Sequence, residues 1–273
     1  MRTISAALQI SRCNLMSKLK KPKKRQIKKA GDETLLEGIR EVLAERQSYG
    51  YRRVTALLNA KLKKCGNRPI NRKKTYRIMK QNHLLLERPL HKIKRPHTGK
   101  VETLFSNTRW CSDTFTIQCQ NGEQVHVAFS IDTCDREIMR YIASTIGIDG
   151  KAIRDLMLET VEYRLGSSRV EKPIQWLSDN GSCYTARETV GFGRELGLDI
   201  RTTPAYSPES NGMAEAFVKT FKRDYVWFGD LKDAKTIMGQ LPKWMDDYNE
   251  KAPHKALKML SPREYIRKQK LAI

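Results

Sequence analysis

The chain has 273 residues, 39% of them hydrophobic and 30% charged, which is enough apolar material for a folded core and too much for a disordered chain. No stretch approaches the roughly twenty apolar residues of a membrane helix, and the six cysteines form no C-x-x-C pair, which excludes membrane-spanning and disulfide-scaffold proteins. The first hundred residues hold 28 Lys and Arg against 6 Asp and Glu, which accounts for the whole net charge of +22, whereas residues 101–273 hold 24 of each sign. We therefore expect a cytoplasmic protein with free thiols, whose basic part binds nucleic acid.

Residues 1–30 form a basic arm that starts with an amphipathic segment. Apolar residues between Ile4 and Leu19 predict a short helix, a tight turn at residues 9–11 and a second helix. This pattern is typical of the last two thirds of a helix-turn-helix. Nothing before it would bury its apolar side chains, so we expect a loosely packed segment. A mitochondrial presequence is the alternative interpretation, because the segment has no acidic residue.

Residues 31–86 are predicted to form three short helices. Apolar residues at helical spacing follow Asp32, stop at residues 48–51 and resume from Val54. Asn71 can cap a third helix over Arg72–Gln81. Three helices with a basic last one resemble a helix-turn-helix domain, which seats that helix in the major groove.

The third helix carries five cations that could lie outward, on DNA phosphates or base edges. They are Arg72, Lys73, Lys74, Arg77 and Lys80. The alternative is an ordinary solvated basic face. The following residues, 87–107, contain Pro89, Pro96 and Gly99 without a sustained period, and predict a linker.

From residue 108 to 273 the pattern changes to strands followed by alternating helices and strands. Three strands are expected at Arg109–Gln118, at Gln124–Asp132 after the turn at Asn121-Gly122, and at about 136–145. Later elements are expected at 150–165 (helix), 174–178 (strand), 185–196 (helix), 199–203 (strand) and in a long helix through Glu215. This order predicts an α/β domain with a mixed five-stranded sheet covered by helices on both faces.

Three acids stand out in this second part. Asp113 lies within the first strand, Asp179 directly follows the apolar strand 174–177, and Glu215 lies beside the apolar stripe of its helix. Carboxylates at such places can hold two Mg²⁺ ions for phosphodiester displacement. Other acids compete for this role, namely Asp132, Asp135 and Glu209, for which solvation in a loop or at a helix N-terminus is the simpler interpretation.

The motifs around these acids resemble those of OrfB-type insertion-sequence transposases of the DDE/integrase core family. They read WCSD at 110–113, WLSDNG at 176–181 and SPESNGMAE at 207–215. Thirty-five residues separate Asp179 from Glu215, and Lys222 follows seven after the glutamate, as in that family. The resemblance extends back to the YGYRR segment at 49–53, with Arg52 and Arg53, and forward to 261–265, so it covers nearly the whole chain.

The resemblance implies a ribonuclease H-like core that cuts DNA at element ends and joins the freed 3′-hydroxyl to another phosphodiester. Asp113, Asp179 and Glu215 would be both the catalytic residues and the ligands of two Mg²⁺ ions, for which Mn²⁺ can substitute. Lys222, with Lys219, would hold a DNA phosphate, and Arg52 and Arg53 would add to DNA binding. Implied partners are element-end and target DNA, further copies of the chain, and the product of an upstream reading frame.

Two other functions remain open at this stage. One is a DNA-binding regulator without catalysis, which the intact acids disfavour. The other is a nuclease of the same fold that hydrolyses RNA–DNA hybrids, which the separate basic helical part disfavours. We expect the protein to be associated with the nucleoid.

Overall fold

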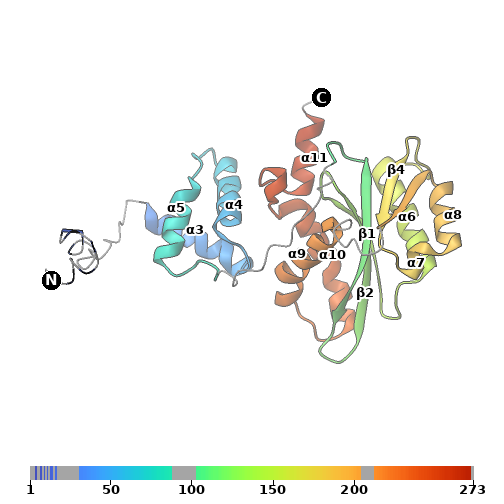
Figure 1. The fold of residues 1–273 in the computed structure, drawn as a ribbon, viewed down its shortest axis with the longest axis horizontal. Coiled ribbons are helices and arrows are strands. Elements are labelled where there is room, and N and C mark those ends of the chain that lie inside the picture. Colours follow the sequence, from blue (N-terminus) through green and yellow to red (C-terminus); the bar gives the residue numbers. More distant parts are fainter. Residues whose placement is uncertain are drawn as a thin grey trace.

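The computed structural model describes residues 31–87, 103–203 and 212–271, together with isolated positions between 4 and 16. A helical part and an α/β part lie beside each other (Figure 1). The partial helix-turn-helix expected at 1–30, most of the expected linker and the competing acid Glu209 lie outside these residues. Of the helices described, none is long and apolar enough to cross a membrane.

The helical part consists of α3 (Asp32–Glu45), α4 (Tyr51–Lys64) and α5 (Arg72–Gln81). Each helix buries the stripe that its sequence predicts, with Leu35, Ile39, Val54, Ile78 and Met79 in one cluster. The Asn71 side chain accepts a hydrogen bond from Lys73 N, which caps α5 as expected. Residues 31–87 therefore have an apolar core of their own.

The α/β part contains a five-stranded sheet of order β3-β2-β1-β4-β5. Its strands are β1 (Arg109–Gln118), β2 (Gln124–Asp132), β3 (Ile138–Ser144), β4 (Ile174–Ser178) and β5 (Leu198–Thr202). β1, β2 and β3 pair antiparallel, while β4 pairs parallel with both β1 and β5. The predicted mixed five-stranded sheet is therefore confirmed.

Helices cover both faces of this sheet (Figure 1). On one face, Phe115, Phe129 and Leu177 of the strands share a cluster with residues of α9 (Gly212–Asp224) and α10 (Ala234–Lys251). On the other face, Trp110 and Trp176 share a cluster with residues of α6 (Gly150–Leu165), and Phe192 of α8 (Arg187–Glu195) packs against this cluster. Alternate residues of a strand point to opposite faces, which explains why both faces are apolar here.

Two expected elements differ in detail from the structure. The third strand begins at Ile138 rather than near 136, because Arg136 takes a left-handed conformation with φ 64° that ends the turn after β2. The helix expected over 185–196 is α8, which begins only at Arg187 because Ala186 is extended, at ψ 134°; a separate short helix that was not expected, α7 (Ser182–Thr185), precedes Ala186. All six cysteines are free, as expected.

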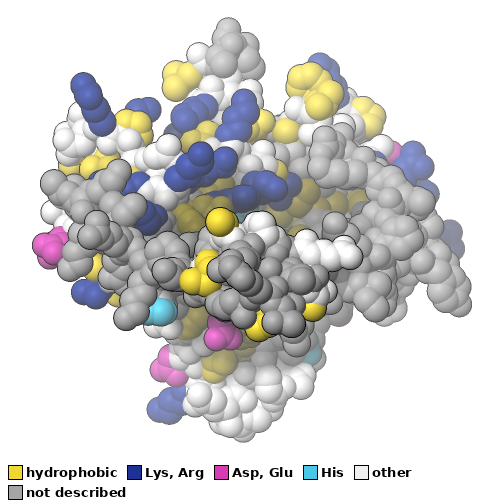
Figure 2. Space-filling model, turned by 60° about the vertical axis from the view of Figure 1, so that its left-hand side comes forward, with side chains coloured by type: hydrophobic (Ala, Val, Ile, Leu, Met, Phe, Trp, Pro, Cys, Tyr) yellow, Lys and Arg dark blue, Asp and Glu magenta, His cyan; other side chains and the backbone are white. Residues whose placement is uncertain are grey.

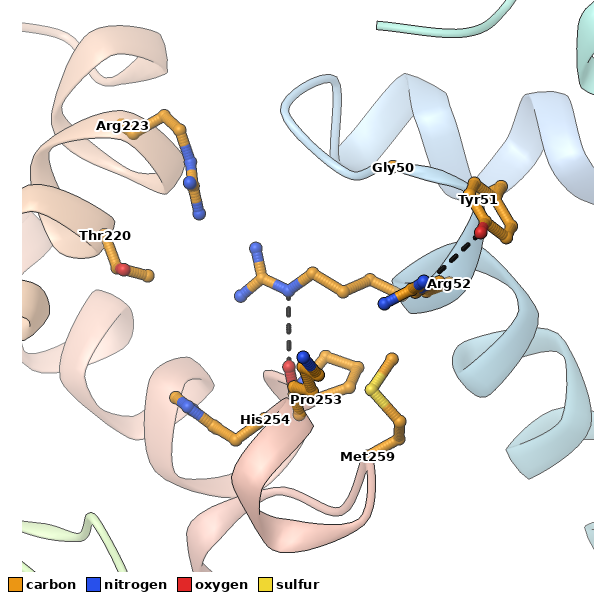
Figure 3. Close-up of a pocket in the computed structure, with 10 residues that line it drawn as sticks. Gly50, Tyr51, Arg52, Thr220, Arg223, Pro253, His254 and Met259 are labelled. Atoms are coloured by element: carbon orange, nitrogen blue, oxygen red, sulfur yellow. Dashed lines mark hydrogen bonds between the residues drawn. The ribbon is translucent and has the colours of Figure 1, made fainter. Parts of the chain in front are cut away.

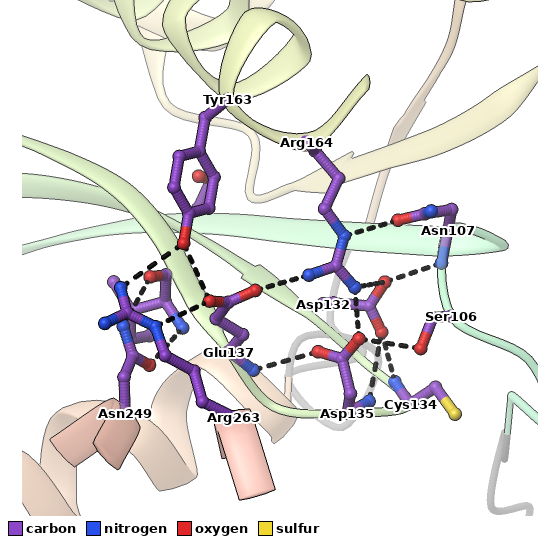
Figure 4. A network of polar contacts seen from close by, with 12 residues as sticks. Ser106, Asn107, Asp132, Cys134, Asp135, Glu137, Tyr163, Arg164, Asn249 and Arg263 are labelled. Atoms are coloured by element: carbon purple, nitrogen blue, oxygen red, sulfur yellow. Dashed lines mark hydrogen bonds and ion pairs between the residues drawn. The ribbon is translucent and has the colours of Figure 1, made fainter. Parts of the chain in front are cut away.

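A buried ion network ties the turn between β2 and β3 to α6 and to α11 (Pro262–Lys270) (Figure 4). Asp132 and Asp135 are fully buried, and Arg164 of α6 forms ion pairs with Asp135 and Glu137. Arg263 of α11 pairs with the same Glu137 at 3.0 Å. The expectation that Asp132 and Asp135 are solvated loop residues is therefore wrong, because a buried cation compensates their charges.

The helical part contacts the α/β part through polar side chains. Arg53 Nη1 lies 2.6 Å from Asp224 Oδ2 at the end of α9, and Ser48 Oγ donates to Asp224 Oδ1 at 2.7 Å. Arg46 pairs with Asp247 of α10. Two short 3₁₀ helices, η2 (Val226–Phe228) and η3 (Lys255–Leu257), complete the C-terminal part, with η3 beside this junction.

Candidate active site

The sheet register brings Asp113 and Asp179 to one place. β1 and β4 are parallel neighbours, with Cys111 paired to Leu177. Asp113 lies two residues further along β1, and Asp179 lies two residues beyond Leu177, directly after β4 ends at Ser178. The negative charge of Asp179 raises the pKa of Asp113, so the two carboxylates lie close enough to interact. Asp113 lies on the face of Cys111 and Phe115, which is the face covered by α9.

Backbone amides fix both carboxylates. Asp113 Oδ1 accepts a hydrogen bond from Thr114 N at 2.8 Å, and Asp179 Oδ1 accepts one from Gly181 N at 3.0 Å. A Cβ atom at position 181 would lie 3.0 Å from that same Oδ1, so glycine lets the loop close over the carboxylate. Asn180 Nδ2 donates to Thr203 O at 2.9 Å, which ties the loop to the end of β5.

α9 supplies the third acid. Its apolar residues Phe217 and Phe221 pack on Phe115 of β1, with ring centroids 6.5 and 5.6 Å away. Glu215 lies in the first turn of α9 and forms an i,i+4 ion pair with Lys219 at 2.9 Å. Lys222 Nζ lies 5.8 Å from the centroid of Phe115, two residues along β1 from Asp113.

Asp113 is electrostatically coupled to the other two acids. The pKa of Asp113 is raised to about 6, mainly by burial and also by the negative charges of Asp179 and Glu215, while the hydrogen bond from Thr114 N opposes the rise. The three side chains are therefore close enough to interact. Across the described part of the chain, however, no three acid, His or Cys side chains already stand at metal-ligand spacing.

The donor set fits a hard divalent cation. Carboxylate oxygens are the ligands that Mg²⁺ prefers, and Asp113 and Asp179 are each held by a backbone amide rather than by a cation. A divalent ion would relieve the repulsion that raises the pKa of Asp113. Glu215 has 41% of its side chain exposed, which leaves it room to move towards such an ion.

A supporting residue escaped the sequence interpretation. Tyr184 of α7 is almost fully buried, and its hydroxyl shares a 2.8 Å hydrogen bond with Ser112 Oγ, beside Asp113. Tyr184 thereby links the helix after Asp179 to the strand that carries Asp113. Its position three residues after Gly181 is the only local signal, and it does not distinguish this role from ordinary packing.

The predicted DNA-binding cations differ in their availability. Arg52, Arg72, Lys73, Lys80 and Lys219 are exposed, and Lys222 is half-buried.

Three of the other predicted cations contact acids of the protein itself. Arg77 donates two hydrogen bonds of 2.9 Å to Asp32, and Lys74 lies 3.6 Å from the same carboxylate. Arg53 contacts Asp224, and its guanidinium lies over the ring of Tyr49. Arg53 and Arg77, which were expected to be free cations, are therefore paired with acids of the protein in this structure.

Figure 2 shows Lys and Arg side chains in a band across the upper part of the face that includes the helical part.

Comparisons with known proteins match both parts of the chain. Residues 30–92 match the family model of an HTH-like domain, and residues 105–208 and 196–262 match two models of an integrase core domain. The chain is 44% identical over 272 residues to the transposase InsD for insertion element IS2A/D/F/H/I/K of Escherichia coli, covering 97% of this chain and 90% of the relative. InsD for insertion element IS2-9 of Escherichia coli strain K12 is equally similar, with 89% of its length covered.

Among solved structures, the fold is similar to a chain in the simian T-cell lymphotropic virus intasome in complex with PP2A regulatory subunit B56 gamma. The TM-score is 0.50 at 16% identity, over 84% of this chain and 73% of that one. At this identity the similarity concerns the fold alone.

Proposed function

The chain belongs to the insertion-sequence transposases with a DDE/integrase catalytic core, and we propose that it cuts the ends of an insertion sequence and joins them to new DNA through Asp113, Asp179 and Glu215. The observation that carries this assignment of residues is the parallel pairing of β1 with β4, which runs to Cys111 and Leu177, each two residues before one of the two aspartates. The transposase relatives support this function over a regulator without catalysis or a ribonuclease.

We assign Asp113, Asp179 and Glu215 as the residues that would hold two divalent cations. Mg²⁺ is the expected ion and Mn²⁺ its substitute. When bound, such ions supply Lewis-acid stabilisation of the attacking and leaving oxygens of the phosphodiester. The chain's own contribution is to orient the carboxylates through Thr114 N and Gly181 N, and the hydrogen bond from Thr114 N also favours the ionised form of Asp113.

Lys222 and Lys219 are assigned to hold a DNA phosphate beside the acids. Lys219 is ion-paired to Glu215, so DNA or cation binding would have to redistribute this pair. The helical part would bind DNA mainly through its exposed cations Arg52, Arg72, Lys73 and Lys80. Arg53, Lys74 and Arg77 would contribute only after leaving their present acidic partners.

Further copies of the chain on DNA and the product of an upstream frame remain proposed partners, as does association with the nucleoid. The domain boundaries at 30, 86 and 107 are likewise proposals, supported by the separate apolar core of the helical part. Terminal-repeat binding and strand transfer by the chain alone, by the chain with the upstream product and by a fusion of the two would test the upstream partner. Full activity of the chain alone would show that the upstream product is not a required partner.

The test of the active site is a cleavage and strand-transfer assay with Mg²⁺ on an element-end duplex. Asp113→Asn, Asp179→Asn and Glu215→Gln should each abolish both steps while leaving duplex binding intact. Strand transfer retained by any one variant would remove that residue from the site.

Two matched controls complete this test. Asp155→Asn removes an exposed acid of α6 and should be silent. Glu209→Gln should be mild, and a loss equal to that of Glu215→Gln would mean that the wrong glutamate was assigned. Hydrolysis of an RNA–DNA hybrid without joining of the terminal duplex would favour the ribonuclease.

A further inference from the structure

A cavity of about 360 Å³ lies at the junction of the helical and α/β parts (Figure 3). Tyr51 and Arg52 at the start of α4 line one side of it, while Pro253, His254 and Met259 of the C-terminal part line another. Arg223 extends towards the opening from α9. The cavity therefore exists only while the two parts are docked.

The lining of this junction cavity carries one sign of charge. Arg52, Arg53, Arg223 and Lys255 line it, and no acid does. Asp224, behind the lining, pairs with both Arg53 and Arg223, but Arg52 and Lys255 are exposed and form no ion pair with any residue that the structure describes. His254 adds no positive charge at neutral pH, because burial lowers its pKa to about 3. One carboxylate therefore offsets four cations.

α9 connects this cavity to the acids. Glu215, Lys219 and Arg223 follow one another at intervals of four residues, so they lie close to one line along the helix. Eight residues of α-helix rise about 12 Å. The same distance corresponds to about three or four base pairs of B-DNA, at 3.4 Å per nucleotide along the strand. A strand whose phosphodiester lies at Glu215 can reach the cavity within a few nucleotides.

We infer that the junction cavity is a second binding site for the DNA backbone, in which Arg52 and Lys255 hold a phosphate a few nucleotides from the one at the acids. The ligand is a phosphodiester, because converging cations that exceed the available carboxylates require an anion and this chain acts on a polyanion. The inference rests on the proposed function for the DNA at the acids, but it assigns Lys255 and the cavity a role of their own. This site recognises the negative charge of the DNA backbone and not the base sequence.

The test measures DNA affinity against salt for the full chain with a 40-base-pair duplex of arbitrary sequence. Each lost phosphate contact lowers the magnitude of the slope of log affinity against log salt by about 0.9. Arg52→Gln with Lys255→Gln should therefore lower it by about 0.9, because both side chains hold the same phosphate. Lys151→Gln with Lys172→Gln removes the same charge from exposed positions on α6 and before β4, and should leave the slope unchanged.

Thermal melting shows whether each double variant is folded, and both should melt like the wild type because all four side chains are exposed. An unchanged slope in a folded Arg52→Gln, Lys255→Gln variant overturns the inference. If inorganic phosphate then stabilises the wild type but not this variant, the cavity binds a small anion instead of DNA. Asp113→Asn should keep the wild-type slope, so loss of catalysis and loss of this site are distinguished.

Discussion

Arg53 of the helical part and Asp224 of the α/β part form an ion pair of 2.6 Å across the junction, although their positions differ by 171 in the sequence. The Asp224 side chain is 1% exposed and that of Arg53 17%. Arg223 also contacts this carboxylate, but 44% of its side chain is exposed. The largely buried Arg53 and the more exposed Arg223 thus share the carboxylate of Asp224.

This difference predicts unequal coupling energies in double-mutant cycles. Arg53→Gln with Asp224→Asn should give a coupling on the order of 1–3 kcal/mol in the free energy of unfolding, because both groups are desolvated. Arg223→Gln with Asp224→Asn should give about 1 kcal/mol or less, because water screens Arg223. Chemical denaturation of the full chain measures both, and equal couplings would contradict the assignment of Arg53 as the main contact.

Asp113→Asn should stabilise the protein while it abolishes activity. The pKa of Asp113 rises from 3.8 to about 6 in the folded state, so stability is lost as the pH rises from about 4 through 6. The shift corresponds to at most about 3 kcal/mol. Solvent screening of this partly exposed side chain reduces the expected gain in unfolding free energy to about 1 kcal/mol. This gain corresponds to a rise of about 2–4 °C in Tm.

Melting curves between pH 4 and 8, with and without Mg²⁺, measure this effect. The gain of Asp113→Asn should be present at pH 7 and fade towards pH 4. Mg²⁺ should raise the Tm of the wild type more than that of the variant, and wild-type activity should fall below pH 6 because protons compete with the ion. A variant less stable than the wild type at pH 7 would show that Asp113 is a structural residue.

Arg164→Met should destabilise the protein strongly. Its side chain is 10% exposed and compensates Asp135 and Glu137, which would otherwise be buried without a cation. Removing one partner of a buried pair costs about 3–5 kcal/mol. Arg154→Met on the same helix is the matched control, because its partner Glu188 is 83% exposed, and should cost at most about 1 kcal/mol. Similar losses in free energy of unfolding would disprove the role of the network in Figure 4.

The charge partition predicts where non-specific duplex binding lies. A fragment of residues 1–88 should bind DNA with steep salt dependence, since it holds most of the excess positive charge, whereas residues 105–273 should bind weakly. Fluorescence anisotropy at several salt concentrations measures both, and circular dichroism establishes that each fragment is folded. Equal binding by the two fragments would contradict the argument from charge.

Much of the architecture follows from the sequence because its signals are local. The capping Asn71, the turn at Asn121-Gly122 and the apolar stripe around Ile78 depend on neighbours a few residues away, and all lie where expected. The acids at the ends of strands and the basic first third are equally visible without a structure. The left-handed Arg136 and the break at Ala186 are not, because neither residue type favours these conformations.

The tertiary structure decided which charges are available. From the sequence, Asp132 and Asp135 are expected to be solvated, but in the fold Arg164, about thirty residues away, packs against them. Likewise Arg53 is expected to contact DNA, but in the fold it forms an ion pair with Asp224. Similarly, only the parallel pairing of β1 with β4 brings the strand of Asp113 beside the strand that Asp179 follows. The sequence determined which groups can carry charge, whereas the fold determined their dielectric surroundings and partners, because these depend on contacts between residues far apart in the chain.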